Sequence, residues 1–173
     1  MSGRVQTSWR MAYLLAAVGI FLVDQVTKAW AVRALRFGRD VTLIPNLLDL
    51  SYAENTGIAF GQLQNGGSTG RWLLVSLALA AAVAVIIYFF RTPRTDDRVL
   101  GACALLLAGI AGNMTDRARL GHVIDFIVLH AGEQFYWPTF NIADASICVG
   151  AGLLALDLIL EGRKQRIQVS SEQ

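Results

Sequence analysis

The sequence predicts a mainly α-helical membrane protein, with four transmembrane helices and a small β-sheet on the outer membrane surface. Three observations support this fold class. Hydrophobic residues make up 54% of the 173 residues and charged residues only 16%, whereas soluble domains carry about 25% charged residues. Four segments approach the roughly 20 apolar residues that cross a bilayer. Between the first two of them, apolar and polar residues partly alternate, which is typical of strands.

The predicted spans cover approximately residues 12–32, 72–90, 99–116 and 140–160. The second contains no charged residue, whereas Asp24 and Lys28 interrupt the first and Asp144 interrupts the fourth. An even number of spans places both termini on the same side of the membrane. The chain length fits a single domain over residues 1–173.

Basic residues favour a cytoplasmic location for both termini, because Lys and Arg concentrate on the cytoplasmic side of membrane proteins. They are denser in the two tails and in the 91–98 loop than in the segments 33–71 and 117–139, which we therefore expect to face outward. The tryptophans fit an aromatic belt in this orientation. The outer interface then holds Trp30, Trp72 and Trp137, and the inner interface holds Trp9.

A cleaved secretory signal is the alternative interpretation of the N-terminus. Arg4 and Arg10 precede the apolar stretch 11–23, and Ala29-Trp30-Ala31 resembles a cleavage site. The bulky Trp30 and the long membrane-bound remainder make an uncleaved first span the more natural interpretation.

The longer outer segment, residues 33–71, is predicted to form a small sheet on the membrane surface. Two stretches of it partly alternate apolar and polar residues: Val41–Ile44 and Leu48–Ala53. Pro45 and Asn46 mark a turn between these stretches, and the glycine-rich residues 64–70 predict a loop that leads into the second span. In the shorter outer segment, residues 123–129 resemble a strand.

Two aspartates are the strongest candidates for a functional site. Asp125 lies within the strand-like stretch, and Asp144 lies at the head of the apolar run that ends at Leu160. Carboxylates in apolar surroundings are costly to ionise, so they tend to be paired, hydrated or functional. Since short connections make neighbouring spans antiparallel, the two carboxylates can converge. Such a pair shares a proton and can hydrolyse a peptide bond by acid–base catalysis without a metal.

Asn113, Asp116 and Arg117 end the third span at helical spacing, so Asn113 shares a face with each of the other two. They are either a polar helix end, with Arg117 reaching the lipid headgroups, or a cluster that holds a substrate carbonyl or orients Asp125. The residues alone leave these alternatives equal.

Other polar residues also have two interpretations. Asp24 and Lys28 are four residues apart and can pair within one helix, either for charge neutralisation or as a strut for the outer sheet or the substrate entrance. Asn55 begins a glycine-rich turn and could instead bind the backbone of an extended peptide. His122 and His130 are isolated, which favours structural roles over a metal site.

Composition and motifs exclude some functions and leave three open. The net charge of +2 is too small and scattered for a nucleic-acid partner, and two cysteines inside predicted spans offer neither a disulfide framework nor a zinc site. Buried acids suit a membrane peptidase or a small proton-coupled transporter, and a structural scaffold is the third possibility. The polar residues cluster at the outer face, which favours a surface site over a pore.

The chain resembles the lipoprotein signal peptidases (signal peptidase II), the aspartic peptidases of the bacterial inner membrane. Its motifs follow the order and spacing of that family across residues 24–144. They are Asp24-Gln25-Val26-Thr27-Lys28, Asn55-Thr56-Gly57-Ile58-Ala59-Phe60, Gly112-Asn113-Met114-Thr115-Asp116-Arg117, Gly121-His122-Val123-Ile124-Asp125-Phe126 and Phe140-Asn141-Ile142-Ala143-Asp144. One departure is Ala108, where the family pattern leads us to expect glycine before Gly109; we expect it to affect packing only.

The resemblance implies an activity and roles for individual residues. Such an enzyme cleaves a prolipoprotein immediately before its diacylglyceryl-modified cysteine at the periplasmic face, uses no cofactor or metal, and is blocked by the cyclic peptide globomycin. Asp125 and Asp144 match the catalytic dyad. Substrate-binding or dyad-supporting positions are matched by Asn55, Gly57, Asn113, Arg117, Asn141 and Ala143, and a structural polar motif by Asp24, Lys28 and Asp116.

Overall fold

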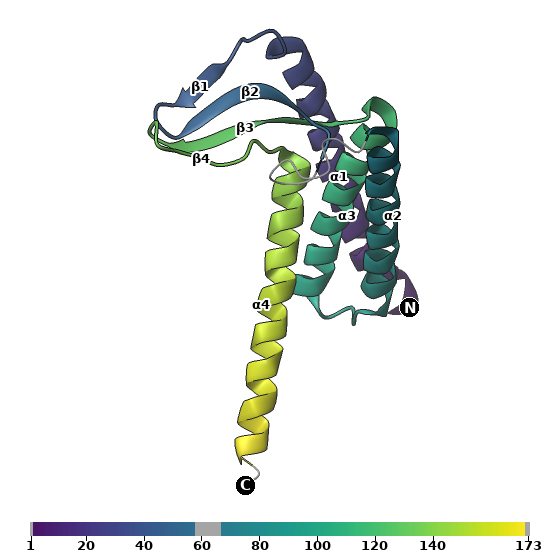
Figure 1. Cartoon of the computed structure of the whole chain (residues 1–173). Helices are drawn as coiled ribbons and strands as arrows, with labels where there is room; N and C mark the ends of the chain where they lie inside the picture. The colour runs from purple at the N-terminus through teal and green to yellow at the C-terminus, as the bar shows by residue number, and fades with distance from the viewer. Residues whose placement is uncertain (1, 58–66, 172–173) are drawn as a thin grey trace.

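Four helices stand side by side in the computed structural model, and a four-stranded sheet lies across one end of them (Figure 1). The structure describes residues 2–57 and 67–171. The helices are α1 (Ser2–Ala34), α2 (Gly67–Arg91), α3 (Asp97–Leu120) and α4 (Ile142–Ser171), and the strands are β1 (Val41–Ile44), β2 (Leu48–Asn55), β3 (Val123–Ala131) and β4 (Phe135–Tyr136). The beginning of α1 and the end of α4 both lie away from the sheet (Figure 1).

The four predicted spans are confirmed. Each helix contains a segment long and apolar enough to cross a membrane: Trp9–Ala34, Ser68–Arg91, Asp97–Leu120 and Ile142–Gly162. The loop predicted for residues 64–70 is wrong over residues 67–70, which form the first turn of α2; residues 64–66 lie outside the described residues. Ser68 and Thr69 favour a helix start here, which the neighbouring glycines obscured.

Helix α3 is the centre of the bundle, because it packs against each of the other three helices. Over half of its span is buried (56%), compared with 11% for α2. Its buried residues are mostly small, including Ala102, Ala104 and Ala108, which lets neighbouring backbones approach closely. The other helices leave Leu, Ile, Val and Phe side chains exposed along their length, as a lipid-facing surface requires.

The ends of α3 are fixed by local caps. Asp96 precedes the helix, and its carboxylate accepts a hydrogen bond from the Val99 amide at 3.2 Å. Gly121 follows the helix at φ 87°, a conformation that glycine adopts without strain, and its N–H donates to the Arg117 carbonyl at 3.1 Å. The abrupt end at Gly121 turns the chain directly into β3.

The sheet is antiparallel, with β2 and β3 at its centre. It confirms the two predicted strands and their turn, in which Asn46 has a positive φ of 64°. It also confirms the strand-like stretch at 123–129. In the register of the central pair, Ala53 lies opposite Asp125 and Asn55 opposite Val123. The pairing therefore carries Asn55 to the beginning of β3, beside the bundle.

An apolar cluster attaches the sheet to the bundle. Ala31 and Leu35 at the end of α1 pack against Ile124 and Phe126 of β3, all four side chains being buried. Trp30 meets the Phe126 ring edge-on, with centroids 6.4 Å apart. Because alternate residues of a strand face opposite sides, burying Ile124 and Phe126 points Asp125 the other way.

Candidate active site

Asp125 and Asp144 meet at the end of the bundle that carries the sheet. Asp125 lies in β3 and is 2% exposed, and Asp144 lies in the first turn of α4. A hydrogen bond between Phe140 N and the Ile127 carbonyl holds the chain before α4 against β3. The predicted convergence of the two segments is therefore present in the structure.

Asn141 joins the two carboxylates. Its side-chain Nδ2 donates to Asp125 Oδ1 at 2.6 Å, and its backbone N–H donates to Asp144 Oδ2 at 3.2 Å. Its Oδ1 accepts from the Asp144 amide at 2.9 Å. Asn141 and Asp144 thus form a reciprocal cap at the start of α4, in the manner of a capping box. The cap fixes the Asp144 side chain relative to Asp125.

Asp125 retains its proton more strongly than an exposed aspartate. Burial and, second, the negative charge of Asp144 raise the pKa of Asp125 to about 6. Hydrogen bonds from Asn55 and Asn141 oppose the rise, since they stabilise the ionised form. The Asn55 Nδ2 donates to Asp125 Oδ2 at 3.1 Å. This is the behaviour expected of one member of a carboxyl pair that shares a proton.

Asn113 and Arg117 complete the polar surroundings from α3. Asn113 Nδ2 donates to Asp144 Oδ1 at 2.7 Å. One helical turn later, Arg117 Nη2 donates to the Gly57 carbonyl at 2.8 Å, and the Gly57 amide donates to Asn55 Oδ1 at 3.1 Å. Arg117 thus holds the end of β2 over the carboxyl pair. The rest of the motif that begins at Asn55, residues 58–60, lies outside the described residues.

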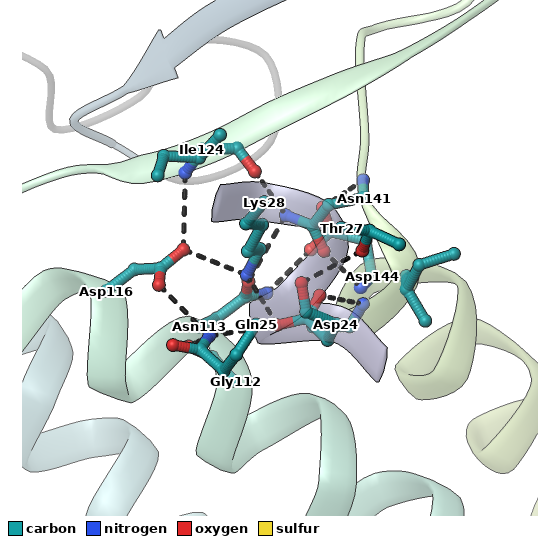
Figure 2. Close-up of polar contacts among 12 residues, drawn as sticks. Asp24, Gln25, Thr27, Lys28, Gly112, Asn113, Asp116, Ile124, Asn141 and Asp144 are labelled. Carbon is teal, nitrogen blue, oxygen red and sulfur yellow. Dashed lines mark hydrogen bonds and ion pairs between the residues drawn. The ribbon is translucent and has the colours of Figure 1, made fainter. Parts of the chain in front are cut away.

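A buried ionic cluster lies beside Asn141 and Asp144 (Figure 2). Lys28 Nζ lies 2.9 Å from an oxygen of Asp24 and 2.9 Å from an oxygen of Asp116. The pairing of Asp24 with Lys28 is confirmed, but Asp116 joins it from another helix. Gln25 was not singled out from the sequence; its Nε2 donates to Asp116 Oδ1 at 3.1 Å and to Asp24 Oδ2 at 3.2 Å. The sequence feature that could have identified Gln25 as a site residue is its position next to Asp24 in the first motif.

All eleven predicted site residues belong to one connected network of hydrogen bonds and ion pairs. The final link is Ala143, whose backbone N–H donates to Asp24 Oδ1 at 2.8 Å. The two histidines lie outside this network. His130 instead lies 3.1 Å from Asp49 in the sheet and stacks on Tyr136.

Glycines in α3 allow α4 to approach this closely. A Cβ at Gly109 would overlap the Ala143 carbonyl oxygen and lie 2.6 Å from Cγ1 of Ile147. A Cβ at Gly112 would lie 3.0 Å from Cβ of Ala143 in α4 and 2.5 Å from the Asp24 carboxylate in α1. Both glycines are therefore required by close approach, and they bring Asp144 into reach of Asn113.

The arrangement suits hydrolysis by paired carboxyl groups rather than metal chemistry. Among the described residues, one group of three side chains could hold a metal ion, namely Asp96, Asp157 and Glu161. It lies at the opposite end of α3 and α4 from the dyad, and Arg98 already pairs with Asp157 at 3.0 Å. The carboxyl pair itself is surrounded by amides and by Arg117, which serve as donors to oxygen.

Comparison with known proteins shows the family to which the chain belongs. The profile of the family described as Signal peptidase (SPase) II matches residues 16–160. The chain is similar to lipoprotein signal peptidases of Pseudomonas syringae pv. tomato (41% identity over 149 residues, 86% of each chain) and Pseudomonas aeruginosa PAO1 (38% identity, 86% of this chain and 88% of the relative).

Two solved structures, each described as a bacterial membrane enzyme, have the same fold. One superimposes with a TM-score of 0.79 at 30% identity, covering 87% of this chain and 89% of the other. The second has a TM-score of 0.74 at 31% identity, covering 85% and 92% respectively. Likeness in sequence and fold thus extends over most of the chain.

Proposed function

Because this chain belongs to the signal peptidase II family, we propose that Asp125 and Asp144 are the catalytic pair with which it removes signal peptides from prolipoproteins. Signal peptide cleavage is the activity of the family, and the chain is a multi-pass membrane peptidase. The observation that carries the residue assignment is the position of Asn141, which donates to both carboxylates at once.

The chemistry needs one proton between the two acids. The ionised carboxylate takes a proton from a water molecule, whose oxygen attacks the scissile carbonyl carbon. The protonated carboxyl group donates to the carbonyl oxygen, giving a tetrahedral diol. The proton taken from water then passes to the leaving nitrogen as the C–N bond breaks, and a hydroxyl of the diol returns its proton to the other carboxylate, which restores the singly protonated pair. The products are a signal peptide with a new carboxylate and a lipoprotein with a new N-terminal amine.

The lipid on the substrate cysteine explains the position of the site. Each buried methylene contributes about 0.8 kcal/mol to membrane anchoring, so diacylglyceryl chains hold the scissile bond near the bilayer surface. Asp125 lies in β3 and Asp144 in the first turn of α4, and the sheet lies across this end of the spans (Figure 1). We infer that this end faces the periplasm, with both termini in the cytoplasm and the whole chain acting as one domain in the inner membrane.

The sheet has a role in holding the substrate. Asn55 and Gly57 at the end of β2 contact Asp125 and Arg117, so an extended peptide lying beside them reaches the carboxyl pair. A globomycin-type cyclic peptide would occupy the same place and block cleavage. No cofactor takes part in the proposed reaction.

The test is cleavage of a diacylglyceryl-modified prolipoprotein in detergent, with a metal chelator present. We expect mass spectrometry to find a product that begins at the lipidated cysteine, and we expect globomycin to suppress it. The matched substrate is the same prolipoprotein without the lipid, which should be cleaved poorly. Absence of product from the lipidated substrate, or a cut at another bond, would refute the proposal.

Replacing Asn55 with alanine is expected to shift the pH dependence of cleavage. The wild-type kcat/KM falls as pH rises through the pKa of Asp125, about 6, because the acid that must donate is then deprotonated. The variant loses a hydrogen bond that favours the ionised form, so the pKa of Asp125 rises further. The fall in kcat/KM then occurs at higher pH.

Glu54→Gln is the matched control for this shift. Glu54 neighbours Asn55 on β2, but its carboxylate accepts from the Tyr52 hydroxyl at 2.8 Å and is 40% exposed, so solvent screens its charge. We expect its pH profile to coincide with the wild type. An Asn55→Ala profile that moves to lower pH would contradict the proposed donation to Asp125.

A further inference from the structure

Lys28 lies at the centre of three polar contacts, with Asp24, Asn113 and Asp116 (Figure 2). The residue is 1% exposed. Its ammonium group lies 2.9 Å from Asp24 Oδ2, 2.9 Å from Asp116 Oδ2 and 3.1 Å from Asn113 Oδ1. An ammonium group has three protons and no acceptor, so all three protons are used. Each of the three partners then makes a further contact.

Two of these further contacts each hold the backbone N–H of the residue that directly precedes one of the two proposed catalytic aspartates. Asp24 Oδ1 accepts from the N–H of Ala143 at 2.8 Å, and Ala143 precedes Asp144. Asp116 Oδ2 accepts from the N–H of Ile124 at 3.3 Å, and Ile124 precedes Asp125. A single cation thus fixes the two carboxylates that hold the two catalytic segments.

The third contact, together with a longer hydrogen bond from Asn141 Nδ2 at 3.3 Å, sets which way the Asn113 amide points. A side-chain amide has an oxygen and an NH2 group of similar size, and its orientation is set by its partners. Because Lys28 can only donate, it requires Oδ1 of Asn113 to face it. The NH2 group must then face outward, where it donates to Asp144 Oδ1 at 2.7 Å.

Lys28 does not touch the reacting carboxylates. Over residues 2–57 and 67–171, no hydrogen bond or ion pair joins it to Asp125 or Asp144. Charge neutralisation within α1 would need only the pair with Asp24, whereas Lys28 also contacts two residues of α3. Its contacts therefore exceed what helix insertion requires.

We propose that Lys28 is the positioning residue of the dyad, setting the orientation of Asp144 through Asn113 and the separation of the two catalytic segments through Asp24 and Asp116. This inference rests on the proposed catalytic roles of Asp125 and Asp144. Without Lys28, the Asn113 oxygen keeps only its longer hydrogen bond from Asn141 Nδ2, at 3.3 Å, and the carboxylates of Asp24 and Asp116 repel each other. The substrate still binds, but the carboxyl pair is displaced from the reacting bond.

The test uses Lys28→Met, which keeps the length of the side chain without its charge. We expect kcat per folded enzyme to fall about 10- to 100-fold, as when supporting contacts of a catalytic group are lost, with KM for the lipidated substrate within about threefold. The pH at which kcat/KM falls should also be higher than in the wild type, because the charge of Lys28 lowers the pKa of Asp125 and the variant lacks this charge. The other charged groups nearby remain: Asp24, Asp116, Arg117 and Asp144.

A charge-balanced variant separates positioning from folding. Lys28→Met combined with Asp116→Asn keeps the formal charge of the cluster at −1, since one cation and one anion are removed together. The amide at position 116 can still accept from Ile124 N, but the Asn113 oxygen loses its shorter hydrogen bond, from Lys28, and keeps only that from Asn141. We expect this double variant to fold and to show the same fall in kcat as Lys28→Met.

Arg98→Met is the matched control, because it removes a cation paired with an aspartate of α4 at the other end of the bundle. Its kcat should stay within about twofold of the wild type.

The outcomes separate this inference from the proposed function. Wild-type kcat and pH profile per folded enzyme in either Lys28 variant would overturn the positioning role. Loss of folded protein in both variants would also overturn it, because Lys28 would then serve folding. If the wild type cleaves the lipidated substrate, these results leave the proposed function standing; a wild type that does not cleave would refute that function itself.

Discussion

Asparagine at position 125 or 144 is expected to lower kcat by at least about 10⁴-fold, because either change removes a carboxyl group from a pair that acts as a unit. An amide has nearly the same shape as the carboxyl group it replaces. It cannot take a proton from water, and it cannot donate one with the required acidity. The measurement is product formation per folded enzyme with the lipidated substrate.

Both variants should remain folded, with a modest loss of stability. Asp125 accepts from Asn55 and Asn141, and Asp144 accepts from Asn113. An amide leaves one of these donors facing an NH2 group, which costs about 1–3 kcal/mol. Thermal unfolding in detergent measures this cost separately from activity.

Asp157→Asn is the matched control for the dyad variants. Asp157 also lies in α4 and is also largely buried, but it pairs with Arg98 at the other end of the bundle. Its kcat should remain within about twofold of the wild type. Activity above about a hundredth of wild type in either dyad variant would contradict the catalytic assignment. Proton flux through the protein in liposomes would then be the next measurement, since a transporter uses buried acids differently.

Replacing Gly109 with alanine is expected to displace α4 and to reduce kcat about 100-fold, since a misplacement of about 1 Å costs that much. The added Cβ would overlap the backbone oxygen of Ala143, and a backbone atom can move only if the helix moves. Asp144 would then lose its hydrogen bond from Asn113. Overpacking also lowers the free energy of unfolding by about 1–3 kcal/mol.

Gly101→Ala tests the same substitution in the same helix without the close contact. The nearest atom to a Cβ at Gly101 is Cε1 of Tyr13 at 3.8 Å, an ordinary contact. Its kcat should be unchanged, and its stability unchanged or raised by up to about 1 kcal/mol, because alanine favours the helix. Equal kcat in the two variants would show that the contact between α3 and α4 does not position Asp144.

The spans and central strands could be predicted because their signals are local. An uninterrupted apolar stretch identifies a membrane helix wherever it packs, and alternation identified the strands on either side of Asn46. Strand β4 was missed because Phe135 and Tyr136 are too short a stretch to show a period. The first turn of α2 was missed because glycines at 66, 67 and 70 predict a loop more strongly than a helix.

Motif resemblance selected residues that the structure brings into one network, whereas spacing along the chain predicted only contacts within a single helix. Spacing within one helix correctly paired Asp24 with Lys28, which are four residues apart. It could not show that Asp116 completes the cluster, because that contact joins α1 to α3 and depends on tertiary packing. Gln25 was missed for the same reason: its amide reaches across to Asp116, a partner 91 positions away.

The contact between Asp24 and the Ala143 backbone has a consequence for the biogenesis of the protein. These residues are 119 positions apart, so during synthesis the first helix enters the bilayer long before the fourth exists. Lys28, one turn away, neutralises Asp24 in the meantime. Only insertion of the last helix supplies Ala143 and Asp144 together. Given the proposed catalytic role of Asp144, the nascent chain therefore becomes an active peptidase only at its final insertion step.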